Sequence, residues 1–88
     1  MRVKIRGRWW TISEEPLRNE WGNCYPSERE IILHPTQRPH RRLDTIVHEL
    51  TLALYPDATE REAEHVARVM SAVLWKDGWR RTRGRAKT

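Results

Sequence analysis

Apolar and polar residues alternate along the first third of the chain, which is the spacing of half-buried β-strands. The alternation covers residues 3–6 and 8–12 and returns at residues 30–34. Gly7 lies between the first two segments and predicts a hairpin. Residues 21–26 combine turn formers with bulky side chains, so they predict a turn or a short edge strand. We therefore expect a small antiparallel sheet in this part of the chain.

The period changes to that of a helix after residue 42. Residues 35–42 hold two prolines and three arginines and predict a loop. Residues 43–55 are apolar around most of a helical circumference, which predicts a central, buried helix ended by Pro56. A second helix is expected over residues 59–76, because Thr59 and Glu62 have capping-box spacing and Gly78 is placed to end it. The predicted fold class is α+β, a small N-terminal sheet followed by two packed helices.

The composition indicates one small basic domain. The 88 residues suffice for a single domain, which we place at residues 1–79, with a basic tail at 80–88 that we expect to be frayed. The net charge is +5 and Cys24 is the only cysteine, so no intramolecular disulfide can form and a reducing compartment is expected. No apolar run is long enough to span a membrane, and the N-terminus is too polar for a signal peptide. These features predict a cytoplasmic protein without a membrane partner.

His48 and Glu49 lie inside the most apolar predicted helix. Burying a histidine and a carboxylate costs free energy unless each finds a partner. In zinc hydrolases, two histidines four residues apart bind the metal from one side of a helix, and the glutamate between them accepts a proton from the metal-bound water. The residue four positions after His48 is Leu52, which cannot bind a metal. Taken alone, the pair favours the simpler interpretation of two helix residues bonded to their neighbours.

Three segments together resemble a known family. They are Thr45-Ile46-Val47-His48-Glu49-Leu50, Ala53-Leu54-Tyr55-Pro56-Asp57 and Val73-Leu74-Trp75-Lys76-Asp77-Gly78-Trp79-Arg80. Over residues 21–80, about two thirds of the chain, the sequence is similar to small metallopeptidases of the zincin superfamily found in bacteriophage genomes. The resemblance implies a minimal gluzincin-like fold, a zinc cofactor, a peptide substrate, Glu49 as catalytic base, and a phage protein in the host cytosol. Because Leu52 replaces the second histidine of the family's HExxH motif, we expect a pseudoenzyme that binds zinc weakly or not at all.

The resemblance places a third ligand, a glutamate, on the second helix. Three acidic candidates lie there, Glu60, Glu62 and Glu64. Helical geometry puts Glu62 within one apolar arc and Glu64 on the opposite side; the arc comprises Ala63, Val66, Ala67, Val69, Met70, Val73 and Leu74. Glu62 is therefore the expected metal ligand beside His48, although capping by Thr59 competes for the same carboxylate. His65 could replace the missing histidine, but a surface histidine is the favoured interpretation.

Other residues support a second class of function. Arginines in residues 38–42 and 80–85 could contact the phosphates of a nucleic acid, although such runs are more often solvated. Cys24 could be a thiol nucleophile, but a lone cysteine among aromatic residues is more often packed. Trp9 and Trp10 should face opposite sides of the sheet. The alternative to a zincin-like domain is thus a basic module that binds nucleic acid or a host protein without enzymatic activity.

Overall fold

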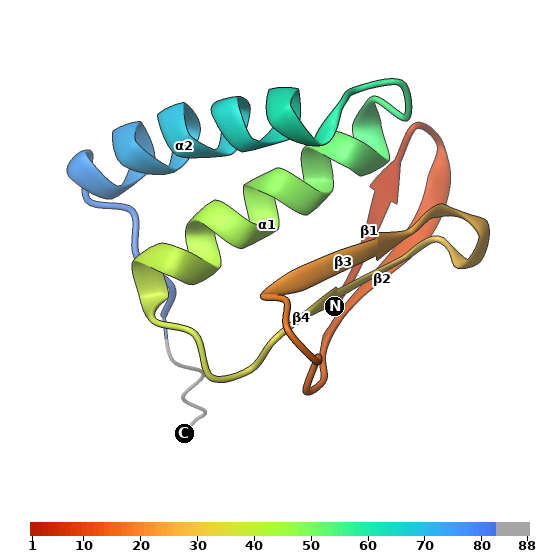
Figure 1. Cartoon of the computed structure of the whole chain (residues 1–88), viewed down its shortest axis with the longest axis horizontal. Coiled ribbons are helices and arrows are strands. Elements are labelled where there is room, and N and C mark those ends of the chain that lie inside the picture. Colours follow the sequence, from red (N-terminus) through yellow and green to blue (C-terminus); the bar gives the residue numbers. More distant parts are fainter. Residues whose placement is uncertain (83–88) are drawn as a thin grey trace.

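The computed structural model describes residues 1–82 and consists of a four-stranded sheet with two helices on one of its faces (Figure 1). The strands are β1 (Arg2–Ile5), β2 (Arg8–Glu14), β3 (Gly22–Tyr25) and β4 (Glu30–Leu33). A short 3-10 turn, η1 (Pro26–Glu28), joins β3 to β4. The helices are α1 (Pro39–Leu54) and α2 (Glu60–Lys76). The expected α+β class, with a small N-terminal sheet followed by two helices, is confirmed.

The sheet has the order β1-β2-β4-β3. It contains both parallel and antiparallel pairs, so the expectation of a wholly antiparallel sheet is wrong. The hairpin β1–β2 and the pair β3–β4 are antiparallel, whereas the central pair β2–β4 is parallel. The parallel pair arises because the chain leaves β2, passes to the outer edge as β3, and returns between the two as β4. This topology makes β3 an edge strand, one of the two outcomes expected for residues 21–26.

The core lies between the sheet and α1. The side chains buried there come from alternate strand positions and from one face of α1: Ile5, Trp10, Ile12, Ile31, Leu33 and Ala53. Trp10 is 6% exposed and its neighbour Trp9 is 51% exposed, so the two tryptophans face opposite sides of β2 as predicted. Neither helix of the described part of the chain combines the length and apolar character that crossing a bilayer requires.

Helix α1 begins within the segment predicted as a loop. Pro39 occupies its first turn, where the fixed φ of proline suits a helix and its missing N–H is not needed. Arg41 and Arg42 are consequently helical residues. The helix ends at Leu54, one residue before the predicted boundary and two before Pro56.

Helix α2 packs on α1 and makes little contact with the sheet, so α1 is the middle layer (Figure 1). Its contact face is narrow and built from small residues, Ala63, Ala67 and Ser71. Ser71 Oγ donates a hydrogen bond to Asp44 Oδ2 of α1 at 3.4 Å. The broad apolar arc expected for α2 is therefore wrong: Val69, Met70 and Val73 are about half exposed or more.

The basic tail begins with residues that are held against the domain. The guanidinium carbon of Arg80 lies 3.5 Å from the centroid of a Trp75 ring, and Arg81 contacts Glu14 at 3.4 Å. These contacts run against the expectation of a freely frayed segment from residue 80 onward. Residues 83–88 lie outside the described part of the chain.

Candidate functional site

The two polar residues in the middle of α1 point toward different neighbours. Consecutive helical residues diverge by about 100° around the axis. The His48 side chain accordingly reaches the start of α2, while Glu49 faces β3 and is only 6% exposed. The motif identified from the sequence thus lies in the layer between the edge strand and α2.

Gly22 of β3 allows Glu49 to approach the strand. A Cβ atom at residue 22 would lie 2.6 Å from Cγ2 of Thr45 and 3.3 Å from both Cγ and Oε2 of Glu49. The first distance is too short for real carbon atoms, so any side chain at this position would push α1 away from β3. Here glycine is required by packing, which is one recognised use of the residue.

Burial raises the pKa of Glu49 to about 7, because desolvation disfavours the carboxylate. His48 opposes this shift, and the carboxylates of Glu60 and Glu20 reinforce it. No side chain or backbone group among residues 1–82 forms a hydrogen bond with the Glu49 carboxyl. A carboxyl with such a pKa can give up or take a proton near neutral pH, as an acid–base group must.

His48 has a partner in α2. Its Nε2 lies 2.9 Å from Oε1 of Glu60; the His48 side chain is 16% exposed and that of Glu60 is 75% exposed. Glu60 was also a candidate from the sequence, where Glu62 was preferred. It lies on the line of α2 that contains Ala63 and Ala67, and this small-residue line was the signal that could have identified the face of α2 packed on α1.

Glu62 does not face inward, so that part of the helix-face argument is wrong. Its Oε1 accepts the backbone N–H of Thr59 at 2.8 Å, and its own N–H donates to Thr59 Oγ1 at 3.0 Å. This is the predicted capping box, the competing role for the same carboxylate. The arc was too broad, because it joined Ala63 and Ala67, which are buried, to the large side chains of Val69, Met70 and Val73, which are about half exposed or more.

His65 is exposed and lies with Glu62 along a shallow depression between the end of α1 and the first turns of α2. Leu52, where a second histidine would be needed, is half-buried. Within residues 1–82, no group of three or more His, Cys, Asp or Glu side chains is arranged to hold a metal ion. The set His48, Glu62 and His65 is thus not assembled, and the residues present do not fit a zinc site.

Cys24 lies on β3 close to the same carboxylates. Burial raises the pKa of its thiol to about 11, and the negative charges of Glu49 and Glu60 add to the effect. Cys24 is one of the partly buried residues that pack against the core cluster. A thiol in this setting stays protonated at neutral pH, which disfavours the nucleophile interpretation and favours the packed side chain.

The outer edge of β3 lies beside Glu49. Trp21 O accepts from His34 N at 2.7 Å, so the antiparallel alternation directs the backbone groups of Gly22 and Cys24 away from β4. The Cys24 N–H donates to Oδ1 of Asn23 at 2.8 Å, and the Asn23 amide donates to the Glu20 carboxylate at 2.9 Å. The Asn23 side chain thereby pairs with one of the backbone N–H donors on this edge, that of Cys24.

The remaining histidines lie outside this site. His34 Nδ1 is 3.1 Å from Oγ1 of Thr36, and its ring packs edge-on against Trp21. His40 stacks on Trp75 with ring centroids 4.6 Å apart.

No protein-family model, curated protein or solved structure matches this chain.

Proposed function

We propose that this chain is a zincin-like domain whose peptidase site is impaired, and that it is a phage protein acting in the cytosol of the host. The observation that carries the proposal is the Glu49 carboxyl, which is 6% exposed, lacks a hydrogen bond among residues 1–82, and faces the edge strand β3. The carboxyl oxygens keep some contact with solvent, yet a carboxyl that loses most of its water and gains no hydrogen bond in the fold calls for an explanation. A retained catalytic-base position explains both its burial and its raised pKa.

The neighbourhood of Glu49 suits an extended peptide as the molecule that the site receives. An edge strand offers main-chain donors and acceptors to which a peptide can add as a further strand. Gly22 and Cys24 present such groups next to Glu49, and the Asn23 side chain would have to release the Cys24 N–H. Titration of peptides selected from a random library should therefore shift the amide resonances of Gly22 and Cys24 before those of β1.

The impairment follows from Leu52. One imidazole and one exposed carboxylate, those of His48 and Glu60, are fewer ligands than a zinc site uses. Calorimetry with zinc at neutral pH should detect no tight binding by the natural chain. Submicromolar one-to-one affinity would contradict the proposed impairment.

Restoring the missing ligand tests whether α1 has the arrangement of a zincin metal-binding helix. Position 52 lies one helical turn after His48, and Cβ atoms at this spacing are about 5–6 Å apart. Leu52→His should therefore gain zinc affinity, with Glu60 as the third ligand, because Glu60 already lies 2.9 Å from His48. Adding Glu60→Gln should then weaken zinc binding, whereas the matched change Glu62→Gln should not. If Leu52→His gains no affinity, the helix does not have the zincin arrangement.

A further inference from the structure

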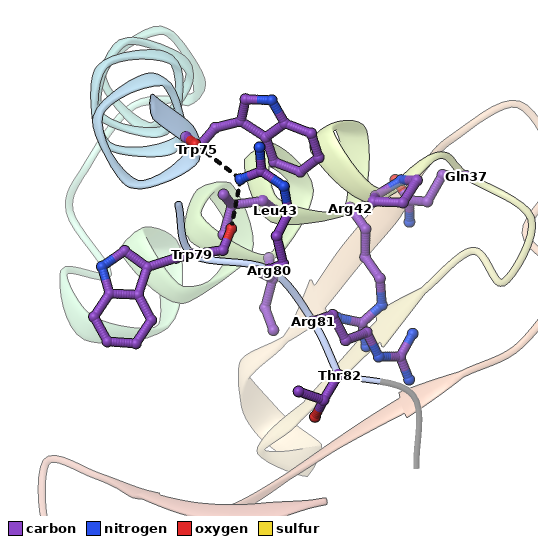
Figure 2. Close-up of a pocket in the computed structure, with 10 residues that line it drawn as sticks. Gln37, Arg42, Leu43, Trp75, Trp79, Arg80, Arg81 and Thr82 are labelled. Atoms are coloured by element: carbon purple, nitrogen blue, oxygen red, sulfur yellow. Dashed lines mark hydrogen bonds between the residues drawn. The ribbon is translucent and has the colours of Figure 1, made fainter. Parts of the chain in front are cut away.

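A second candidate site lies away from Glu49, where the N-terminal half of α1 meets the end of α2. It is a cleft of about 800 Å³ closed on one side by the segment that follows α2 (Figure 2). Its walls combine arginines with tryptophans and aliphatic side chains: Gln37, Pro39, Arg42, Leu43, Ile46, Trp75, Trp79, Arg80, Arg81 and Thr82. None of these residues contributes to the site around His48 and Glu49.

Arg80 is held in a fixed position within the cleft. Its guanidinium carbon lies 3.5 Å from the centroid of a Trp75 ring, and one Nη donates to the carbonyl oxygens of Trp75 at 2.8 Å and Trp79 at 3.0 Å (Figure 2). His40 stacks on the same indole with an interplanar angle of 3°. The other guanidinium N–H groups of Arg80 have no partner among residues 1–82, so they remain able to bind an oxyanion. A preorganised arginine loses little entropy when it does so.

Positive charge exceeds negative charge in this cleft. Arg42 and Arg81 both contact one carboxylate oxygen of Glu14, at 3.0 and 3.4 Å. The hydrogen bond from Arg42 is the main cause that holds the pKa of Glu14 below its usual range, so this carboxylate is ionised at neutral pH. Counting Arg80, three guanidinium groups line the cleft, whereas the carboxylates in contact with its lining residues are two, those of Glu14 and of Asp77 beside Trp79. The surplus attracts an anionic ligand.

The tryptophans determine which anion fits best. Trp79 is 63% exposed, and its indole N–H donates to Oδ2 of Asp77 at 3.1 Å, which fixes one edge of the ring while most of the side chain stays open. We propose that this cleft binds single-stranded nucleic acid, with a base stacked on Trp79 and phosphates at Arg80, Arg81 and Arg42. Proteins that bind single strands combine a basic groove with aromatic side chains on which bases stack. A duplex keeps its base faces covered, and an acidic peptide has no planar rings to stack.

The test is fluorescence anisotropy of the full chain with a labelled single-stranded oligonucleotide of about ten nucleotides, in the range covered by one small binding domain. Trp79→Ala should weaken binding about fivefold or more, since loss of one stacked base has effects of this order. Trp79→Phe should retain most of the affinity, because it keeps an aromatic face. Trp9→Ala is the matched control, an exposed tryptophan on the sheet, and should leave binding unchanged.

The charged residues give a second measurement. Arg81→Ala should lower the affinity and reduce the slope of log affinity against log salt by about one, as expected for one phosphate contact. Arg61→Ala, on the exposed side of the first turn of α2, should do neither. Thermal midpoints of all variants establish that each is folded.

Three results would overturn the proposal. They are equal affinity of wild type and Trp79→Ala, affinity for a duplex of the same length that matches or exceeds that for the single strand, and displacement of the oligonucleotide by an acidic peptide of equal charge. The basic residues Arg83, Arg85 and Lys87 are tested separately by changing all three to serine. Binding that still depends on Trp79 in that variant supports the cleft, and binding that disappears with these three charges alone refutes it. Neither outcome depends on whether the chain is a zincin-like domain.

Discussion

The raised pKa of Glu49 predicts an unusual dependence of stability on pH. The group titrates near pH 7 in the folded protein, against an ordinary value of 4.5. The folded state therefore binds more protons than the unfolded chain between these values, and the free energy of unfolding must fall as the pH rises through this window. Above about pH 7 the curve should level off.

The magnitude follows from the size of the pKa shift. At about 1.4 kcal/mol per unit, a shift from 4.5 to about 7 corresponds to a loss of about 3 kcal/mol between pH 4.5 and pH 8. The carboxyl oxygens of Glu49 are not completely removed from solvent, so screening reduces this upper value to about 1–2 kcal/mol. Glu14, whose pKa is lowered, has the opposite dependence, but its contribution is lost only as the pH falls below about 4.5. The two groups therefore act in separate pH ranges.

Glu49→Gln should abolish most of this dependence. The neutral amide resembles the protonated acid, so the variant should match the wild type near pH 5 and exceed it in stability at pH 8. A gain of about 1–2 kcal/mol corresponds to roughly 5–10 °C in thermal midpoint for a domain of this size. Urea unfolding at pH 5, 6, 7 and 8 measures the effect directly.

Two controls isolate Glu49. Glu64→Gln, on the exposed side of α2, should leave the pH profile unchanged. His48→Gln removes the contact with Glu60 and so measures what that ion pair adds to the slope. A wild-type stability that stays level or rises between pH 5 and pH 7, or a Glu49→Gln variant with the wild-type slope, would refute the reasoning.

Two further predictions concern the contact between β3 and α1. Gly22→Ala should lower the free energy of unfolding by about 1–3 kcal/mol, because its Cβ would lie 2.6 Å from Cγ2 of Thr45. Adding Thr45→Ser, which removes that methyl group, should recover part of the loss in urea unfolding. No recovery would show that another contact is responsible. Cys24 should react with a disulfide reagent at pH 7.5 far more slowly in the folded protein than in urea, because the pKa of the thiol is about 11; equal rates would contradict its burial beside Glu49.

Local patterns in the sequence predicted most of the elements. Alternation marked the strands, and the hairpin around Gly7 formed because that residue adopts a φ of +79°. The capping box of Thr59 and Glu62 was also predicted correctly, because both partners lie within one helical turn and the motif is therefore local. The parallel pairing of β2 with β4 could not be predicted in this way, because it depends on where β3 is placed in space.

The candidate site was harder to predict because its geometry is set between elements. His48 and Glu49 were identified from their position in the apolar helix, but their neighbours Gly22, Cys24 and Glu60 come from β3 and α2. The error over Glu62 has a physical cause. The large apolar residues of α2 were assumed to share the buried side with its alanines, whereas the two helices pack closely through alanine and serine alone, which leaves Val69 and Met70 outside.

Helix α1 is the middle layer of the fold, so the buried polar groups on it must find their partners within the protein. Thr45 donates to Gln37 Oε1 at 2.7 Å, Thr51 to the Val47 carbonyl oxygen at 2.7 Å, and Asp44 and His48 have partners in α2. Glu49 is the exception, and above neutral pH the fold bears the cost of its charge. A small domain has only a thin margin of stability from which to offset a cost of about 1–2 kcal/mol. Replacing Glu49 with a neutral residue would remove that cost, so its presence points to a use for the carboxyl beyond folding, and this argument holds whether or not a metal is ever bound beside it.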